Sequence, residues 1–234
     1  MQTLTVQIWS DIACPWCYVG KRRLEAALST LPWRSKIQVL WCAFELDPNA
    51  SREADTAPVL YAERLARKYG TSVPEGQAMI DRMTGVAATD GLAFRFDIIR
   101  PGNTFDAHRL VHLAHDRGIQ DIMKERFLRA YMCEGESMAN REALTRLAVE
   151  AGLDEREVID VLAGDAYAEA VRADEALARR YNISGVPFFV IGERYGISGA
   201  QPAETLREAL STAWQDIADA PVAQGMACGP DGCD

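Results

Sequence analysis

The pattern of hydrophobic and polar positions divides the chain into strand-forming ends and a long helical middle. A short apolar strand is predicted over Leu4–Trp9, followed by a helix over Trp16–Leu31. A second strand is predicted at Ile37–Phe44, where the nearly continuous apolar run is typical of a strand covered on both faces. These three elements form a β-α-β unit, for which a right-handed crossover is expected.

Helical periodicity then runs from Ala57 to about Tyr181. Glycines such as Gly70, Gly118 and Gly164 separate the predicted helices. The predicted helices are Val59–Tyr69, Pro74–Ala88, Phe105–Arg117, Ile122–Cys133, Arg141–Ala151, Glu155–Ala163 and Tyr167–Tyr181. A block of roughly 120 residues is close to the ordinary size of a domain.

Strand patterns return after this helical block. Pro187–Gly192 and Tyr195–Ser198 are predicted strands, joined by a tight hairpin at Glu193-Arg194, and a last helix is predicted over Ala203–Ile217. The order predicts one small α/β layer assembled from both ends of the chain. The helical block would then be a lid over the helix start that carries Cys14.

This order also predicts the domain organisation. Residues 1–50 together with 182–218 are expected to form the α/β domain, and residues 51–181 the helical insertion. Residues 219–234 are rich in Gly, Pro and Ala, which predicts a mobile tail.

Composition and charge exclude several classes of function. The chain has 234 residues, 48% of them hydrophobic and 25% charged, which is ordinary for a soluble globular protein. A net charge of −9 argues against a nucleic-acid interface, and scattered basic residues give no membrane-binding patch. No apolar run is long enough to span a membrane, and Met1-Gln2-Thr3 shows no secretion signal, so we expect a cytoplasmic protein.

The chemistry of the chain centres on Cys14-Pro15-Trp16-Cys17, at the junction of the first strand and helix. Two thiols three positions apart lie on one helical turn, where they can close a disulfide or share a metal. Pro15 suits the first helical position, and the partial positive charge of a helix N-terminus predicts a lowered pKa for Cys14. The junction favours redox chemistry over half of a structural zinc site, because a structural zinc site needs a second nearby cysteine pair in a loop-rich setting.

Three motifs resemble a known family. Cys14–Cys17 after a strand, and Gly185-Val186-Pro187-Phe188-Phe189-Val190 downstream, resemble the thioredoxin fold and its cis-proline loop. The long helical insertion is similar to that of the DsbA family, and the segments 11–21, 103–110 and 185–189 resemble its FrnE-type oxidoreductases. The resemblance implies an α/β, thioredoxin-like fold with a large all-helical insertion.

The resemblance also implies a function and site residues. A thiol–disulfide oxidoreductase of this kind needs no cofactor and acts on thiols or disulfides of protein substrates, with glutathione or a reductase as a candidate electron source. Cys14 would attack and Cys17 would resolve the mixed disulfide. Val186 would offer its backbone to an extended substrate, Pro187 would be cis and pack against the disulfide, and Trp16 would meet the substrate.

The remaining candidates receive plainer interpretations. Cys42 lies inside a predicted buried strand and is expected in the core, and Cys133 is expected to be a spare thiol. The histidines, His108, His112 and His115, share one helix face, where packing or hydrogen bonding is favoured over a metal site.

Two further expectations concern the surroundings of the thiols. Trp9 and Tyr18 could line an apolar groove with Trp16, although a core position is equally expected for Trp9. A carboxylate after the second strand, Glu45 or Asp47, could take up protons during exchange.

The tail carries a second cysteine pair, Cys228 and Cys233, around Gly-Pro-Asp-Gly. This turn chemistry brings the two thiols together, and we expect an auxiliary redox pair that exchanges with Cys14–Cys17.

Two alternatives stay open. A glutathione-dependent isomerase or transferase, of the 2-hydroxychromene-2-carboxylate isomerase or kappa class, has the same architecture. A zinc-linked redox sensor could use Cys14, Cys17, Cys228 and Cys233 as four thiolate ligands.

Overall fold

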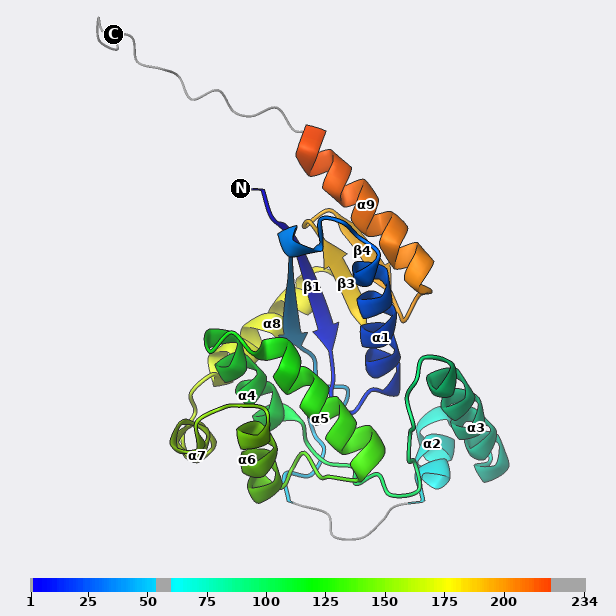
Figure 1. The fold of residues 1–234 in the computed structure, drawn as a ribbon. Helices are drawn as coiled ribbons and strands as arrows, with labels where there is room; N and C mark the ends of the chain where they lie inside the picture. The colour runs from blue at the N-terminus through cyan, green and yellow to red at the C-terminus, as the bar shows by residue number, and fades with distance from the viewer. Residues whose placement is uncertain (1, 54–59, 220–234) are drawn as a thin grey trace, which may run out of the picture.

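Both ends of the chain contribute strands to one sheet, as the sequence predicts. The computed structural model describes residues 2–53 and 60–219. In these ranges β1 (Leu4–Ser10) runs parallel to β2 (Ile37–Ala43) and antiparallel to β3 (Phe188–Ile191). β3 in turn pairs antiparallel with β4 (Tyr195–Ser198), so the strand order is β2-β1-β3-β4 (Figure 1).

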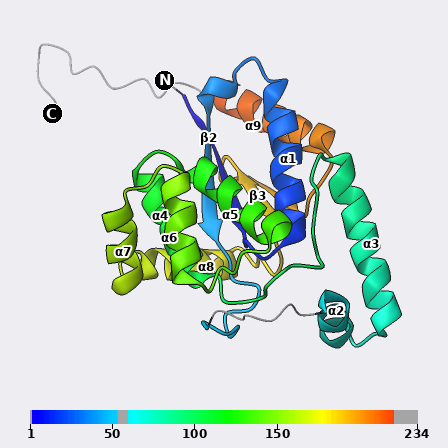
Figure 2. The ribbon, with the colours of Figure 1, turned by 60° about the horizontal axis from the view of Figure 1, so that its bottom comes forward.

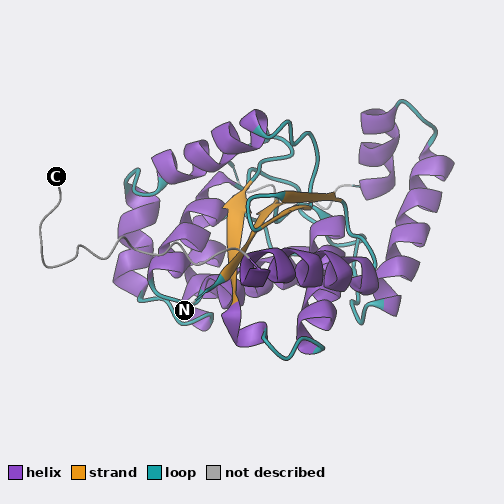
Figure 3. Ribbon diagram, turned by 90° about the horizontal axis from the view of Figure 1, so that it is seen from above, coloured by secondary structure: helices purple, strands orange, loops and turns teal. Residues whose placement is uncertain are grey.

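Helices cover both faces of this sheet, as Figure 3 shows from above. α1 (Pro15–Ser29) and α9 (Ala203–Asp219) pack together on the face to which Ile8 contributes. α8 (Ala168–Arg180) packs on the other face, where Trp9 lies in a cluster with Ala178. The alternation of side chains along β1 therefore gives each face its own apolar surface.

The helical insertion divides into two parts, which Figure 2 shows on either side of α1. α2 (Tyr61–Tyr69) and α3 (Val73–Thr89) form a helical hairpin beside α1. The other part packs with α8 and consists of α4 (Phe105–Asp116), α5 (Gln120–Glu134), α6 (Arg141–Glu150) and α7 (Glu155–Ala163). A 3-10 turn at Arg34–Lys36 leads into β2. The insertion therefore consists of two parts rather than one lid. We call α2 and α3 the α2–α3 arm, and α4 to α7 the helical buttress.

β2 is an edge strand, and the expectation that it is covered on both faces is only half right. Trp41–Ala43 is buried, whereas Ile37–Leu40 is half-buried or exposed. The side-chain amide of Gln120 accepts from the Trp41 amide at 3.0 Å and donates to the Trp41 carbonyl at 2.9 Å. Asp174 accepts from the Ala43 amide at 2.7 Å. Helical side chains therefore satisfy backbone groups that an edge would leave unpaired.

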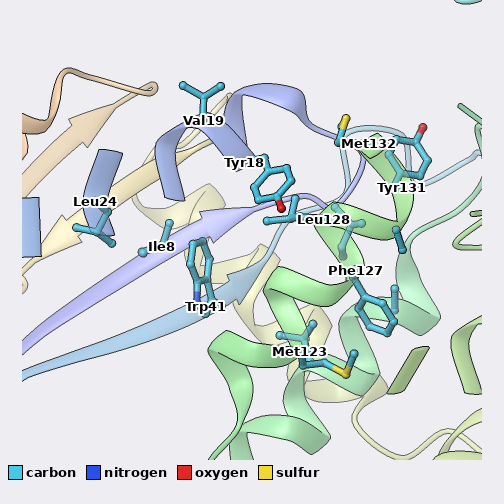
Figure 4. Packing of buried hydrophobic residues seen from close by; sticks show 14 of the residues in the cluster. Ile8, Tyr18, Val19, Leu24, Trp41, Met123, Phe127, Leu128, Tyr131 and Met132 are labelled. Carbon is cyan, nitrogen blue, oxygen red and sulfur yellow. The ribbon is translucent and has the colours of Figure 1, made fainter. Parts of the chain in front are cut away.

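The core beneath α1 joins the sheet to the helical buttress (Figure 4). Ile8, Trp41, Phe127 and Leu128 belong to one cluster of buried residues. Burying an aliphatic or aromatic side chain of this size contributes about 1.5–3 kcal/mol. The buttress and the sheet consequently stabilise each other.

Element boundaries differ from the predicted ones by a few residues. α3 begins at Val73 rather than Pro74, because Ser72 and Glu75 form a capping box. α2 ends at Gly70, which adopts the left-handed conformation (φ 64°). Among the described helices, none is both long and apolar enough to cross a membrane.

Candidate active site

The two thiols of the Cys-x-x-Cys motif lie where β1 gives way to α1. Cys14 is the N-cap of α1, and its amide donates to the Asp11 carbonyl at 3.3 Å. Pro15 occupies the first turn, and the Cys17 amide donates to the Cys14 carbonyl at 3.0 Å. Both cysteines are free thiols, and the first turn of α1 carries no acidic residue. The helix N-terminus therefore favours negative charge here without a competing carboxylate.

The two thiols differ in access. Cys14 is 4% exposed and lines a cavity, whereas Cys17 is fully buried. Cys14 is therefore the more accessible of the two thiols, although both are buried.

The loop before β3 closes over Cys14. The Val186–Pro187 peptide bond is cis, which confirms the prediction. The Cys14 thiol donates to the Val186 carbonyl at 3.5 Å. A Cβ at Gly20 would lie 2.9 Å from Pro187 Cγ, so the absence of a side chain at Gly20 lets α1 touch this loop.

A buried lysine lies below the motif. Lys124, on α5, is fully buried, and its ammonium donates to the Ser10 carbonyl at 3.1 Å and lies 5.5 Å from the centre of the Trp41 ring. The Ser10 hydroxyl is also buried, and a hydrogen bond from it lowers the pKa of Cys17. A cation and a hydroxyl are both suited to stabilise negative charge on Cys17.

The charges around the thiols favour a thiolate at Cys17. Burial by itself raises the pKa of Cys17, but a hydrogen bond from Cys14 and the nearby Lys124 ammonium lower it below its ordinary value. The hydrogen bond to Cys17, together with burial, raises the pKa of Cys14. The structure therefore does not bear out the predicted low pKa of Cys14, because the hydrogen bond to Cys17 and burial both favour its protonated form.

The carboxylate closest to the motif in sequence is Asp11, which the sequence reasoning did not assign a role. Its side chain is buried, lies 3.4 Å from His108 Nε2, and accepts from the Leu46 amide at 2.8 Å. Burial raises the pKa of Asp11, but His108 and the Leu46 amide outweigh it and lower that pKa. Asp11 therefore stays ionised and holds the loop before Cys14.

Both carboxylates predicted for proton uptake pair with arginines. Glu45 is buried against Asn103 Nδ2 at 3.1 Å and Arg172 at 2.6 Å, so it fixes the loop after β2. Asp47 is half exposed, 3.8 Å from Arg64.

The predicted apolar groove is present, with one of its three predicted aromatic residues. A cavity of about 400 Å³ opens beside Cys14, and Trp16, 44% exposed, lines it. Trp9 is buried in the core and donates to the Asp174 carbonyl at 2.9 Å. Tyr18 is also buried, and its hydroxyl donates to Glu125 at 2.6 Å. The opposite wall of the cavity comes instead from the α2–α3 arm.

The other described cysteines and His112 lie in packing or hydrogen-bonding positions. Cys42 is buried, and burial raises its pKa, while Cys133 is half-buried. His112 pairs with Asp174 at 2.9 Å, as the predicted hydrogen-bonding role requires. Within residues 2–53 and 60–219, no group of His, Cys, Asp and Glu side chains is placed to hold a metal. The tail pair Cys228 and Cys233, on which the zinc-sensor hypothesis depends, lies outside the described residues.

Lys124, like Asp11, is a residue of the site that the sequence reasoning missed, although the sequence carries a signal for Lys124. Lys124 falls within the buried stripe of α5, with Met123, Phe127 and Leu128 at helical spacing around it. A lysine at an apolar position of an amphipathic helix indicates a buried cation with a specific partner.

The fold and the site together define a thioredoxin-type dithiol protein with a helical insertion. The model of the DSBA-like thioredoxin domain matches residues 5–211, and the chain belongs to this family. It is 47% identical to a probable DsbA oxidoreductase from Streptomyces coelicolor, with a TM-score of 0.87 and coverage of 99% of this chain and 98% of the other.

Two further matches are more distant. An uncharacterised protein, YwbO, from Bacillus subtilis is 28% identical, over 89% of this chain and 96% of its own. The cytosolic disulfide reductase DsbM from Pseudomonas aeruginosa, solved with GSH, is 20% identical with a TM-score of 0.63, and 90% of this chain and 99% of that one are covered.

Proposed function

We propose that this chain is a thiol–disulfide oxidoreductase of protein substrates, of the FrnE-like group within its family. The observation that carries the proposal is the difference between the two thiols. Cys14 opens on an apolar cavity beside the Val186 carbonyl, and Cys17 is buried behind it, close to a cation. One accessible nucleophile with one buried resolving thiol is what disulfide exchange requires.

In the reductive direction, the Cys14 thiolate attacks a substrate disulfide. A bond forms between Cys14 and one substrate sulfur, and the other substrate sulfur leaves as a thiolate. The Cys17 thiolate then attacks Cys14, which closes the Cys14–Cys17 disulfide and releases the second substrate sulfur. Two electrons pass to the substrate, its sulfurs take up two protons, and an external thiol or reductase restores the dithiol. The oxidative direction is the reverse sequence.

The surroundings of Cys14 supply the substrate contacts. The Val186 carbonyl, now the acceptor for the Cys14 thiol, is placed to pair with the backbone of an extended segment once Cys14 has reacted. Trp16 offers exposed apolar surface to the side chains of that segment, and Pro187 holds the loop against α1 through Gly20.

We place this activity in the cytoplasm, where thiols are kept reduced and a catalytic Cys-x-x-Cys pair can be recycled. The description of DsbM as cytosolic supports this placement.

The test is reduction of insulin disulfides by dithiothreitol, followed by turbidity, with the wild type and Cys14→Ser. We expect the wild type to accelerate the reaction and the variant to lose the acceleration. A wild type with no effect on the insulin reaction refutes the proposed function. The reduction potential, measured in glutathione buffers, then gives the direction of electron flow.

A glutathione-dependent isomerase or transferase is the second candidate. It is favoured by the cations Lys68 and Arg82 on the cavity, which suit the carboxylates of glutathione. Such a reaction needs no resolving thiol. Cys17→Ser would therefore keep the activity of this second class and lose multiple-turnover disulfide reduction.

A further inference from the structure

The cavity beside Cys14 has two unlike walls. One wall consists of the start of α1 and the loop at Gly185 and Val186, and the other consists of α2 and α3. Apolar side chains dominate both walls, and Trp16 and Tyr69 remain 44% and 60% exposed at its margin. An exposed apolar surface of this kind, next to a reactive sulfur, suits an apolar side chain of a substrate.

The charge of this cavity is opposite to that of the chain. The chain carries 34 acidic and 25 basic residues. Of the described residues that line the cavity, two are cations, Lys68 and Arg82, and none is a carboxylate. A positive recess in a protein of net charge −9 attracts anionic groups that the rest of the surface repels.

The cations of the arm are also available to a ligand. Within the described residues, Arg82 forms no hydrogen bond or ion pair, and Lys68 contacts only the Tyr69 ring, at 5.7 Å. A neighbouring recess on the same side of α2 adds Arg64 and Arg67. Arg64 lies 3.8 Å from Asp47, so it is partly neutralised, whereas Arg67 has no carboxylate partner among the described residues.

Building on the proposed function, we propose that the α2–α3 arm selects protein substrates in which the reacting cysteine lies in an extended segment with an apolar residue and a carboxylate close by. An extended chain rises about 3.3 Å per residue, so the residues that flank a cysteine bound at Cys14 enter the same cavity that Lys68 and Arg82 line. The apolar residue would contact Trp16, and the carboxylate would pair with the cations of the arm.

The preference for acidic substrates should be moderate and sensitive to salt. Exposed ion pairs change binding by roughly two- to fivefold each, so the two cations together give about a tenfold preference for an acidic over a basic substrate. Because these side chains are at the surface, we expect salt at several times physiological strength to remove most of that preference.

The experiment compares three disulfide-linked fluorescent peptides that differ only in the residues flanking the cysteine, which are Glu, Gln or Lys, beside a constant Leu. The kcat/KM of reduction is measured for the wild type and for Lys68→Gln/Arg82→Gln. Arg34→Gln/Arg156→Gln is the control, because it removes the same charge from exposed residues that do not line this cavity.

We expect the wild type and the control to prefer the Glu peptide over the Lys peptide by about tenfold. The Lys68→Gln/Arg82→Gln variant should reduce the two peptides at similar rates and reduce the Gln peptide as the wild type does. Equal rates for the Glu and Lys peptides in the wild type, or an unchanged preference in the variant, would overturn the selectivity.

Oxidised glutathione is the fourth substrate. It shows whether the two cations recognise a small acidic disulfide or a protein segment. If Lys68→Gln/Arg82→Gln slows glutathione reduction and leaves the peptide preference intact, the cations serve the small thiol and our proposal is wrong. Failure of the wild type to reduce the Gln peptide contradicts the proposed function itself, whereas turnover of that peptide without a charge preference contradicts the selectivity alone.

Discussion

The Nζ atom of Lys124 lies 3.1 Å from the carbonyl oxygen of Ser10, in a fully buried position. Burial lowers the pKa of Lys124, while the nearby thiols and Asp11 favour its charged form. The helical insertion thus delivers a positive charge to the underside of the motif, in addition to the partial charge of the helix N-terminus.

Replacing Lys124 tests this relationship. In Lys124→Met we expect the pKa of the first thiol deprotonation to rise by about one unit, because a cation that stabilises the Cys17 thiolate is lost. The rate of alkylation near neutral pH should fall by up to about tenfold. The thiolate absorbance followed against pH gives the pKa directly.

The matched control for Lys124→Met is Arg129→Met, which removes an exposed cation from the same helix. An unchanged thiol pKa in Lys124→Met, or an equal shift in the control, would show that Lys124 does not act on the thiols.

The two cysteines should behave differently in trapping and labelling. Cys14→Ser should lose disulfide reductase activity, and Cys17→Ser should accumulate mixed disulfides, because Cys14 can then attack but not be released. In the wild-type dithiol, alkylation should occur first at Cys14, which is 4% exposed against none for Cys17. Peptide mapping by mass spectrometry checks the order, and faster labelling of Cys17 would reverse the assignment.

Asp11 links the stability of the fold to pH. Its pKa in the fold lies below the ordinary 3.8, so its contribution is present above that pH and is lost as the pH falls through the folded-state value. Asp11→Asn should lower the free energy of unfolding by about 1–3 kcal/mol near neutral pH. The difference from the wild type should shrink in acid, as urea denaturation at both pH values can show.

An exposed carboxylate on α7 provides the control for Asp11. Asp160→Asn should leave the unfolding free energy unchanged within about 0.5 kcal/mol at both pH values. A difference between Asp11→Asn and the wild type that is constant with pH would exclude the linkage.

The contact between Gly20 and Pro187 should be intolerant of a methyl group. Gly20→Ala places a Cβ 2.9 Å from Pro187 Cγ, so the loop must move away from α1. We expect a loss of about 1–3 kcal/mol of stability from overpacking. Disulfide reductase activity should fall as well, because Val186 shifts relative to Cys14.

Gly85→Ala is the matched change for Gly20→Ala. Gly85 lies in α3, and a Cβ there meets no atom within 4 Å. This variant should gain up to about 1 kcal/mol from helix propensity. Similar unfolding midpoints for the two alanine variants would contradict the importance of the close contact.

The tail pair provides the remaining prediction. If Cys228 and Cys233 exchange with the active site, Cys228→Ser/Cys233→Ser should slow re-oxidation of the Cys14–Cys17 dithiol. Turnover and re-oxidation rates equal to those of the wild type would show that the pair is not a relay.

Local patterns in the sequence predict the strands, the helices and the two thiols, because each depends on residues close in the chain. The cis peptide bond between Val186 and Pro187 is also predicted, from the motif around Pro187. The positions of Lys124 and Asp11 are not predicted, since their partners come from other elements and burial depends on how those elements pack. The packing of elements also decides the place of Trp9. The alternation of side chains along β1 turns Trp9 toward α8, so it lies in the core rather than in the cavity beside Cys14.

The pairing of the Gln120 amide with the Trp41 backbone has a consequence for engineering. A shortened protein that kept only the sheet, α1 and α9 would expose β2 as an open template for another chain. Such a truncation would still carry Cys14 and Cys17, yet we expect it to self-associate through strand addition. By covering the edge of β2, the insertion therefore also opposes self-association of the sheet.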